Sequence, residues 1–220
     1  MQTPSFSKAS TPDAAPAVAK RPSFREQQFQ AREAAILTVV NRILSSKGYD
    51  LMTMDEIAAE VGIAKPSLYK HFDSKEMLAA TAMTRLLERA LMQINAQPAD
   101  QPPLESLKAV LRWALAAHLE GSMPLLPSTR STIRQSLVNH APYIEKLIQL
   151  TDAIGKWIQA ARQQGEISTA VPDELVMFTI FARACDPTLE FLRETGQYSD
   201  AQIVELMVHV CFKGFASSSS

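Results

Sequence analysis

Apolar residues recur every three or four positions along most of this chain, with polar residues between them. This periodicity is typical of amphipathic helices, and no strand pattern interrupts it after the proline-rich stretch near residue 100. Glycines, prolines and capping residues divide the pattern into segments that we expect to be separate helices. The expected helices cover residues 23–47, 53–61, 66–72, 74–97, 104–120, 129–139, 142–164, 172–194 and 199–213. The predicted fold class is therefore all-α, with a kink where Pro187 interrupts one long helix.

Residues 53–66 carry the start and stop signals of two short helices joined by a turn. Thr53 and Glu56 form a capping box, in which each side chain accepts a hydrogen bond from the other residue's backbone N–H. Gly62 follows the first helix, where a residue without a Cβ tolerates the left-handed conformation of a helix C-cap. Pro66 comes four residues later, at a position suited to the first turn of the next helix.

The second helix of this pair is short and mostly polar. Leu68 and Phe72 are its apolar positions, and we expect both to be buried. Its remaining side chains include Lys65, Ser67, Tyr69, Lys70 and His71. A short helix with polar and basic residues around most of its circumference is suited to contact with a partner outside the protein. A helix, a tight turn and an exposed second helix are the arrangement of a helix-turn-helix DNA reader.

Residues 36–80 resemble the DNA-binding domain of the tetracycline-repressor (TetR) family of bacterial regulators. The resemblance rests on matches in fixed register at Gly48, Tyr49, Thr53, Ile57, Ala58, Gly62, Ile63, Leu68, Tyr69, His71, Phe72, Lys75, Glu76 and Leu78. It implies an N-terminal three-helix DNA-binding domain followed by an all-helical domain for ligand binding and dimerisation. The chain departs from the family pattern in the long segment that precedes the DNA-binding domain.

The predicted DNA-binding residues lie in and around the second helix of the pair. The set is Thr53, Lys65, Pro66, Ser67, Tyr69, Lys70, His71 and Lys75. The resemblance implies that Tyr69 and Lys75 grip phosphates, although packing or solvent exposure is the alternative for both. Thr53 joins them because a helix N-terminus attracts anions.

Other members of the same set are predicted to contact bases. By their spacing, Lys65, Ser67 and Lys70 face the groove, and a lysine can donate to the O6 and N7 acceptors of guanine. For His71 a phosphate contact is favoured over a base contact. The net charge of the chain is −1, but the local charge agrees with this assignment. Between residues 63 and 75 the sequence has three lysines and a single acid, Asp73, which gives a local charge of +2.

Proline and polar residues divide the chain into four parts. Residues 1–22 are rich in proline, alanine, serine and lysine, and we expect a disordered basic extension there. Residues 23–80 form the expected DNA-binding domain, and residues 81–215 the effector-binding and dimerisation domain. The proline-rich linker at 96–103 lies near the seam, and residues 216–220 form a disordered tail.

The sequence shows no signal for a membrane span, a redox pair of cysteines or a catalytic site. No apolar run approaches the roughly 18 residues needed to span a membrane. Cys185 and Cys211 lie in apolar helical patterns and are predicted to be buried free thiols of a cytoplasmic protein. The seven glycines are isolated, there is no G-x-S-x-G elbow, and the four histidines share no metal-ligand spacing with cysteines or acids. We therefore expect no catalytic residues, no metal site and no cofactor.

The second domain offers a candidate effector site and a candidate interface. Polar groups in an apolar wall fix ligand orientation, so the candidate lining residues are Trp113, His118, Phe178, Arg183 and Asp186. The alternatives are plain core packing for the apolar members and a solvent-edge ion pair for Arg183 and Asp186. By the family resemblance, residues 172–194 and 199–213 form a four-helix interface with their copies in a homodimer.

These patterns predict a ligand-responsive transcriptional regulator of the bacterial cytoplasm, associated with the nucleoid when it is bound to DNA. It would bind a palindromic operator in double-stranded DNA as a homodimer, and a small, largely apolar effector would release it as a repressor. An activator, or a DNA-binding protein without a small ligand, is the alternative within this class. A helical enzyme or an interaction module that carries a helix-turn-helix is the alternative from another class.

Overall fold

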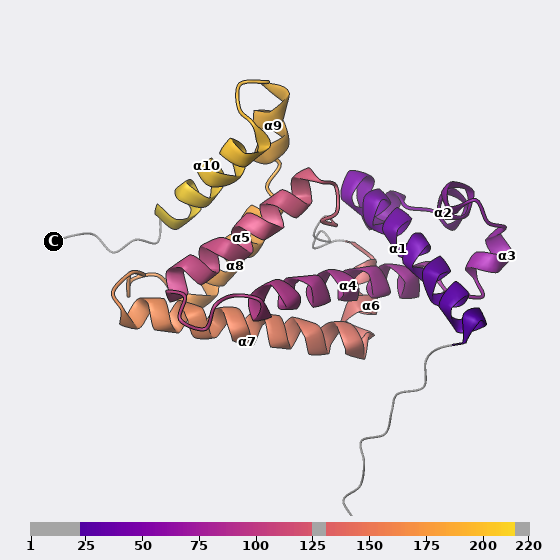
Figure 1. The fold of residues 1–220 in the computed structure, drawn as a ribbon, viewed down its shortest axis with the longest axis horizontal. Coiled ribbons are helices and arrows are strands. Elements are labelled where there is room, and N and C mark those ends of the chain that lie inside the picture. Colours follow the sequence, from indigo (N-terminus) through magenta and orange to yellow (C-terminus); the bar gives the residue numbers. More distant parts are fainter. Residues whose placement is uncertain (1–22, 125–130, 214–220) are drawn as a thin grey trace, which may run out of the picture.

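The structure is a computed structural model that describes residues 23–124 and 131–213. All regular elements within these two ranges are helices, which confirms the predicted all-α class (Figure 1). The helices are α1 (Phe24–Leu51), α2 (Met54–Val61), α3 (Lys65–Leu68), α4 (Lys75–Asn95), α5 (Pro103–Leu119), α6 (Ile133–Asn139), α7 (Ala141–Gln163), α8 (Asp173–Ala184), α9 (Thr188–Glu194) and α10 (Asp200–Lys213). The expectations for residues 1–22 and 216–220 fall outside the described residues.

Two hydrophobic cores form, and the long helix α4 contributes to both. The N-terminal core gathers side chains from α1, α2, α3, the first turns of α4, and α6. The C-terminal core gathers side chains from the rest of α4 together with α5, α7, α8 and α10. Helix α6 belongs to the first core through Ile133 and Leu137, although its sequence position is far beyond residue 80. The two parts of the molecule are therefore joined both by α4 and by α6.

The structure corrects the expectation of one kinked helix over residues 172–194. Helix α8 ends at Ala184, and α9 begins only at Thr188. Pro187 has no N–H to donate to the backbone, and Cys185 leaves the helical conformation with φ −119° and ψ 25°. The carboxylate of Asp186 instead accepts the backbone N–H of Thr188 at 2.9 Å, which starts a separate helix.

The cap of α2 also differs from the expected one. The Thr53 hydroxyl accepts from the backbone N–H of Glu56 at 3.3 Å, but the return bond of a capping box is not formed. The Glu56 carboxylate accepts from Lys47 Nζ at 2.6 and 2.5 Å instead, because a charged donor makes a stronger hydrogen bond than a backbone amide. At the start of α4 the cap is Ser74, whose hydroxyl accepts from the backbone N–H of Met77 at 3.0 Å.

Both cysteines are free thiols, as predicted, but only one of them is buried. Burial raises the pKa of the Cys211 thiol to about 11. Cys185 is partly exposed, since it lies in the break between α8 and α9. Within the ranges that the structure describes, no helix is both long enough and apolar enough to cross a membrane.

Candidate nucleic-acid interface and internal cavity

A tight turn presents α3 at the surface of the N-terminal core. Gly62 ends α2 with φ 74° and ψ 34°, the left-handed conformation that was predicted for it. Helix α3 has four residues, and Leu68 is its anchor because this side chain is completely buried in the core. Pro66, Tyr69 and Lys70 are left exposed around the anchor. The short helix is thus held by one apolar side chain and offers its polar residues to the outside.

Lys65, the first residue of α3, is paired within the protein. Its Nζ lies 2.9 Å from Oδ2 of Asp55 in the first turn of α2, and this hydrogen bond raises the pKa of Lys65. Both side chains are well exposed, so the ion pair contributes little to stability. A base contact by Lys65 would therefore exchange Asp55 for an acceptor on DNA at small energetic cost.

Lys75, the first residue of α4, lies against Tyr49 of α1. Its Nζ lies 4.2 Å from the centroid of the Tyr49 ring, a cation–π contact. The Tyr49 hydroxyl donates to Oε1 of Glu76 at 2.8 Å. Burial, together with this hydrogen bond, raises the pKa of Tyr49 well above its usual value. The phenol therefore stays protonated and holds the first turn of α4 against α1.

His71 differs from the other candidate DNA contacts because it faces the protein. Its side chain is only 5% exposed, and its ring stacks on Phe29 with 4.2 Å between centroids. The Nδ1 atom lies 3.7 Å from Oε1 of Glu33. A phosphate contact through this imidazole would require it to leave the stack.

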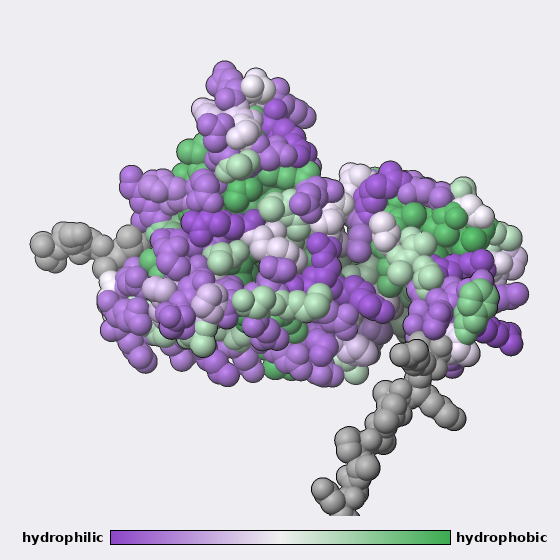
Figure 2. Space-filling view, in the orientation of Figure 1, coloured by the Kyte–Doolittle hydropathy of each residue, from purple (hydrophilic) through white to green (hydrophobic). Residues whose placement is uncertain are grey.

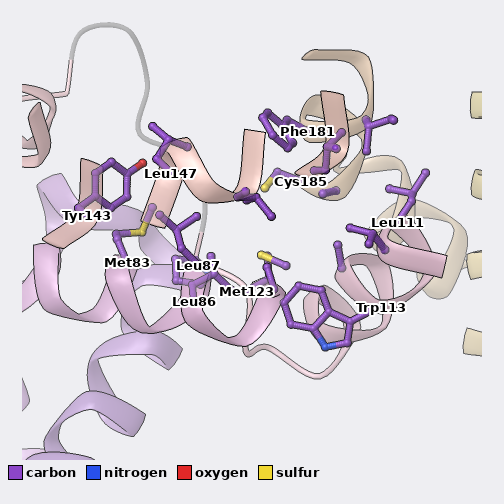
Figure 3. A pocket seen from close by; sticks show the side chains of 18 residues that line it. Met83, Leu86, Leu87, Leu111, Trp113, Met123, Tyr143, Leu147, Phe181 and Cys185 are labelled. Carbon is purple, nitrogen blue, oxygen red and sulfur yellow. The ribbon is translucent and has the colours of Figure 1, made fainter. Parts of the chain in front are cut away.

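An internal cavity of about 130 Å³, partly open to the surface, lies between α4, α5, α7 and α8 (Figure 3). Its walls are formed by Met83, Leu86, Leu87, Ala90, Val110, Leu111, Trp113, Ala114, Met123, Pro124, Tyr143, Leu147, Leu150, Ile154, Ile180, Phe181, Ala184 and Cys185. None of these side chains is charged. The polar groups are the Tyr143 hydroxyl, the Trp113 indole N–H and the Cys185 thiol, and burial raises the pKa of Tyr143.

Of the five residues expected to line an effector site, Trp113 lines this cavity and the other four do not. His118 lies with Nδ1 3.2 Å from the carbonyl oxygen of Ala184. Arg183 and Asp186 pair at 2.5 Å, which matches the ion-pair alternative. Phe178 is 65% exposed on the outer face of α8.

The sequence pattern did not single out Met83, Tyr143 and Leu147, which lie at one end of the cavity (Figure 3). They occupy the apolar stripes of α4 and α7, where a cavity residue and a core residue have the same periodicity. Tyr143 is the most informative of the three because it packs against both cores and also lines the cavity.

A second link between the two parts of the molecule is polar. Asp50, at the end of α1, accepts a hydrogen bond from the hydroxyl of Ser131 at 3.2 Å and from that of Thr132 at 3.4 Å. Ser131 and Thr132 directly precede α6. The start of α6 is therefore tied to the unit that carries α3.

Large apolar side chains remain exposed on the last three helices and on the segment between α9 and α10. They are Leu175, Phe178, Phe191, Tyr198, Leu206 and Val210. Figure 2 shows hydrophobic surface in the region of α10 and below α9. Contiguous apolar surface of this kind is typical of an interface with another protein. Elsewhere in the described ranges, no three His, Cys, Asp or Glu side chains gather as metal ligands.

Comparison with known proteins agrees with this geometry. The family model for bacterial regulatory proteins of the tetR family matches residues 36–82, which run from α1 into α4. The HTH-type transcriptional regulator EthR of Mycolicibacterium smegmatis is 37% identical over 146 residues, covering 64% of this chain and 65% of EthR. TcmR of Streptomyces glaucescens, also an HTH-type transcriptional regulator, is 23% identical over 121 residues. That alignment covers 55% of this chain and 54% of TcmR, so the chain spans about half the length of this relative.

Solved structures extend the likeness over both parts of the fold. The crystal structure of AibR in complex with isovaleryl coenzyme A and operator DNA superposes with a TM-score of 0.58 and 23% identity. The alignment covers 82% of this chain and 98% of AibR. The helix-turn-helix geometry and the family match agree that residues 36–82 are similar to the bacterial regulatory proteins of the tetracycline-repressor (TetR) family, and the solved structures extend the shared fold over both parts of the molecule.

Proposed function

We propose that this protein is a ligand-responsive transcriptional repressor that leaves its operator when a small effector occupies the internal cavity. The observation that carries the proposal is the course of α4. Its first residue, Lys75, is one of the candidate DNA contacts, and Met83, eight residues and about 12 Å further along the helix, lines the cavity. One rigid helix thus connects the candidate DNA contacts to the candidate effector site.

The DNA contacts of this regulator are those predicted from the sequence, with one change of role. Tyr69, Lys70 and Lys75 bind phosphates or base edges directly, and Lys65 does so after leaving Asp55. Thr53 and the N-terminus of α2 add an anion site. His71 contributes by holding the end of α3 in place, which its burial against Phe29 supports.

The effector is small and largely apolar. A cavity of about 130 Å³ is close to one of 150 Å³ that holds benzene in another protein, so a larger molecule has to push the lining side chains apart. AibR was crystallised with isovaleryl coenzyme A. The present cavity has no charged lining residue to pair with the phosphates of such a molecule, and its walls favour an uncharged effector or the acyl part of a thioester.

The regulator acts as a homodimer through α8, α9 and α10. One short reading helix makes few contacts, and a second half-site about one DNA turn away supplies the remaining affinity. The exposed side chains of Phe178, Leu206 and Val210 support a partner on this face. A protein that acts on bacterial DNA works in the cytoplasm, associated with the nucleoid while bound.

Release follows if the effector favours a conformation in which the two copies of α3 no longer match the half-site spacing. Tyr143, which joins the cavity to both cores, and Asp50, which ties α1 to the start of α6, provide the mechanical link. The effector must prefer the released state, and the coupling is typically about 1–3 kcal/mol.

Selection of DNA by the protein itself tests the proposal. Duplexes enriched from a random library should converge on a palindrome, and Tyr69→Ala and Lys75→Ala should weaken binding to them. Loss of Lys75 should also reduce the slope of log affinity against log salt by about 0.9, the value for one phosphate contact. Lys156→Ala, on α7, is the control and should leave both quantities unchanged.

The outcome also separates the alternative functions. Enrichment of a sequence that is not a palindrome would remove the paired half-sites. No enrichment at all, or equal behaviour of all three variants, would remove the DNA-reading role and favour an enzyme or interaction module. An activator would bind the same duplexes but raise transcription from a promoter placed beside them. A DNA-binding protein without a ligand would show no release by any apolar compound that raises its melting temperature.

A further inference from the structure

The first turns of α1 lie outside the segment that matches the family. The match begins at residue 36, whereas α1 begins at Phe24, so twelve residues and about 18 Å of helix precede it. The helix has a defined start, because Ser23 and Glu26 form a complete capping box. Nearly all of its first twelve residues are exposed. This helical extension has no role in either hydrophobic core.

The extension is nonetheless attached to the reading unit at one point. Phe29 stacks on His71, the third residue after α3, with 4.2 Å between ring centroids and an angle of 29° between the planes. Glu33, one turn further along, places Oε1 3.7 Å from Nδ1 of His71. These contacts hold the extension in one orientation beside α3 (Figure 1).

Two arginines flank this attachment point. Arg25 precedes Phe29 by four residues and Arg32 follows it by three, so all three side chains lie on the same side of the helix. The two acids of the extension are already engaged, since Glu26 caps the helix and Glu33 faces His71. Within the described part of the chain, neither arginine side chain has a hydrogen-bond or ion-pair partner. Both guanidinium groups are therefore available to an anion outside the protein, in a segment whose two arginines and two glutamates balance in formal charge.

We propose that Arg25 and Arg32 bind DNA phosphates just outside the half-site that α3 reads, and that Phe29 is the residue that positions them. The proposal rests on the proposed DNA-binding function and adds a contact surface to it. DNA is the partner favoured by the arrangement, because the arginines share a side of α1 with Phe29, whose ring stacks on His71, and the exposed candidate DNA contacts Tyr69 and Lys70 directly precede His71 in the chain. At 3.4 Å per base pair, an 18 Å helix spans about five base pairs of flanking duplex.

The test compares binding to two duplexes made from the palindrome that the protein selects. One duplex ends at the palindrome, and the other carries about five additional base pairs on each side. Arg25→Gln and Arg32→Gln should each weaken binding to the longer duplex several-fold and lower its salt slope by about 0.9, with little effect on the shorter one. Arg85→Gln, an exposed arginine on α4, is the matched control and should behave as wild type on both.

The role of Phe29 is tested by coupling. In a Phe29→Ala background, Arg25→Gln and Arg32→Gln should lose most of their effect, because the extension is no longer held beside α3. Phe29→Tyr keeps an aromatic ring and should restore the effect. A full effect of the arginine variants in the Phe29→Ala background would show that Phe29 is only structural and would overturn its positioning role.

The outcomes also separate this proposal from the one on which it rests. If wild type binds its palindrome and Lys75→Ala weakens binding, but Arg25→Gln and Arg32→Gln match Arg85→Gln, the flanking contact is wrong and the DNA-reading function stands. Equal losses on the short and long duplexes would also overturn it, since the arginines would then touch the palindrome itself. If wild type selects no DNA at all, the proposed function fails together with the flanking contact.

Discussion

Filling the internal cavity from its wall should stabilise the protein and weaken its hold on DNA. Ala114 on α5 lines the cavity and is buried, and Ala114→Leu adds three carbon atoms to a space of about 130 Å³. At about 0.8 kcal/mol for each buried methylene, the gain has an upper limit of about 2.4 kcal/mol. For a chain of this size, about 2–4 °C per kcal/mol converts this limit into a rise of about 5–10 °C in melting temperature.

The same variant should imitate a bound effector. If an occupied cavity favours the released conformation, Ala114→Leu should weaken binding to the selected palindrome by about fivefold or more, in line with a coupling of at least 1 kcal/mol. Differential scanning calorimetry and fluorescence anisotropy measure the two effects. Ala116→Leu is the control, because Ala116 lies on the same helix but does not line the cavity.

Two results would refute this reasoning in different ways. Overpacking costs about 1–3 kcal/mol, so a fall in melting temperature below that of Ala116→Leu would mean that the cavity cannot accept three carbons. A rise in melting temperature with unchanged DNA affinity would mean that the cavity is empty but not coupled to α3. Only stabilisation together with weaker DNA binding supports the proposed path through α4 and Tyr143.

Two further predictions concern the interface and the thiols. Val210→Lys should convert the homodimer, which light scattering should find at about twice the 24.3 kDa chain mass, into a monomer that keeps its helical circular dichroism. The control is Met92→Lys on α4, which should leave the dimer intact although Met92 is as exposed as Val210 (60% against 59%). Loss of the dimer in both variants would argue against a specific dimer interface on α10. Burial raises the pKa of Cys211 to about 11, so a thiol reagent at pH 8 should modify only the partly exposed Cys185 in the native protein. Cys211 should react only as the pH nears 11 or after unfolding. Rapid modification of both thiols at pH 8 would show that Cys211 is not held in the core.

Local signals in the sequence were sufficient to predict the helix-turn-helix and its exposed surface. Gly62 adopts the left-handed conformation expected of a C-cap, and Leu68 is buried as its place in a polar helix suggested. These features depend on backbone conformation and on one-sided burial, which are properties of a few consecutive residues. The all-helical class follows from the same periodicity, but the separation of α8 from α9 within residues 172–194 was not predicted.

Features that depend on competition between distant groups were decided only by the tertiary structure. Glu56 was expected to close the capping box of Thr53, but its carboxylate instead accepts hydrogen bonds from the charged amino group of Lys47 on α1. His71 was expected to face DNA, but Phe29, 42 positions earlier in the chain, covers its ring. No local sequence pattern predicts Lys47 as the partner of Glu56 or Phe29 as the partner of His71, because both partners lie on a different helix.

The cavity could not be predicted from the sequence either, because it depends on how the helices pack together. Ala114, Tyr143 and Leu147 have the spacing of ordinary core residues, and only the way four helices meet leaves a space between them. Sequence periodicity determines which side of a helix is buried, since burial of apolar surface drives folding. Whether the buried sides fill the interior or enclose a space depends on the angles and distances between helices, which belong to the assembled fold alone.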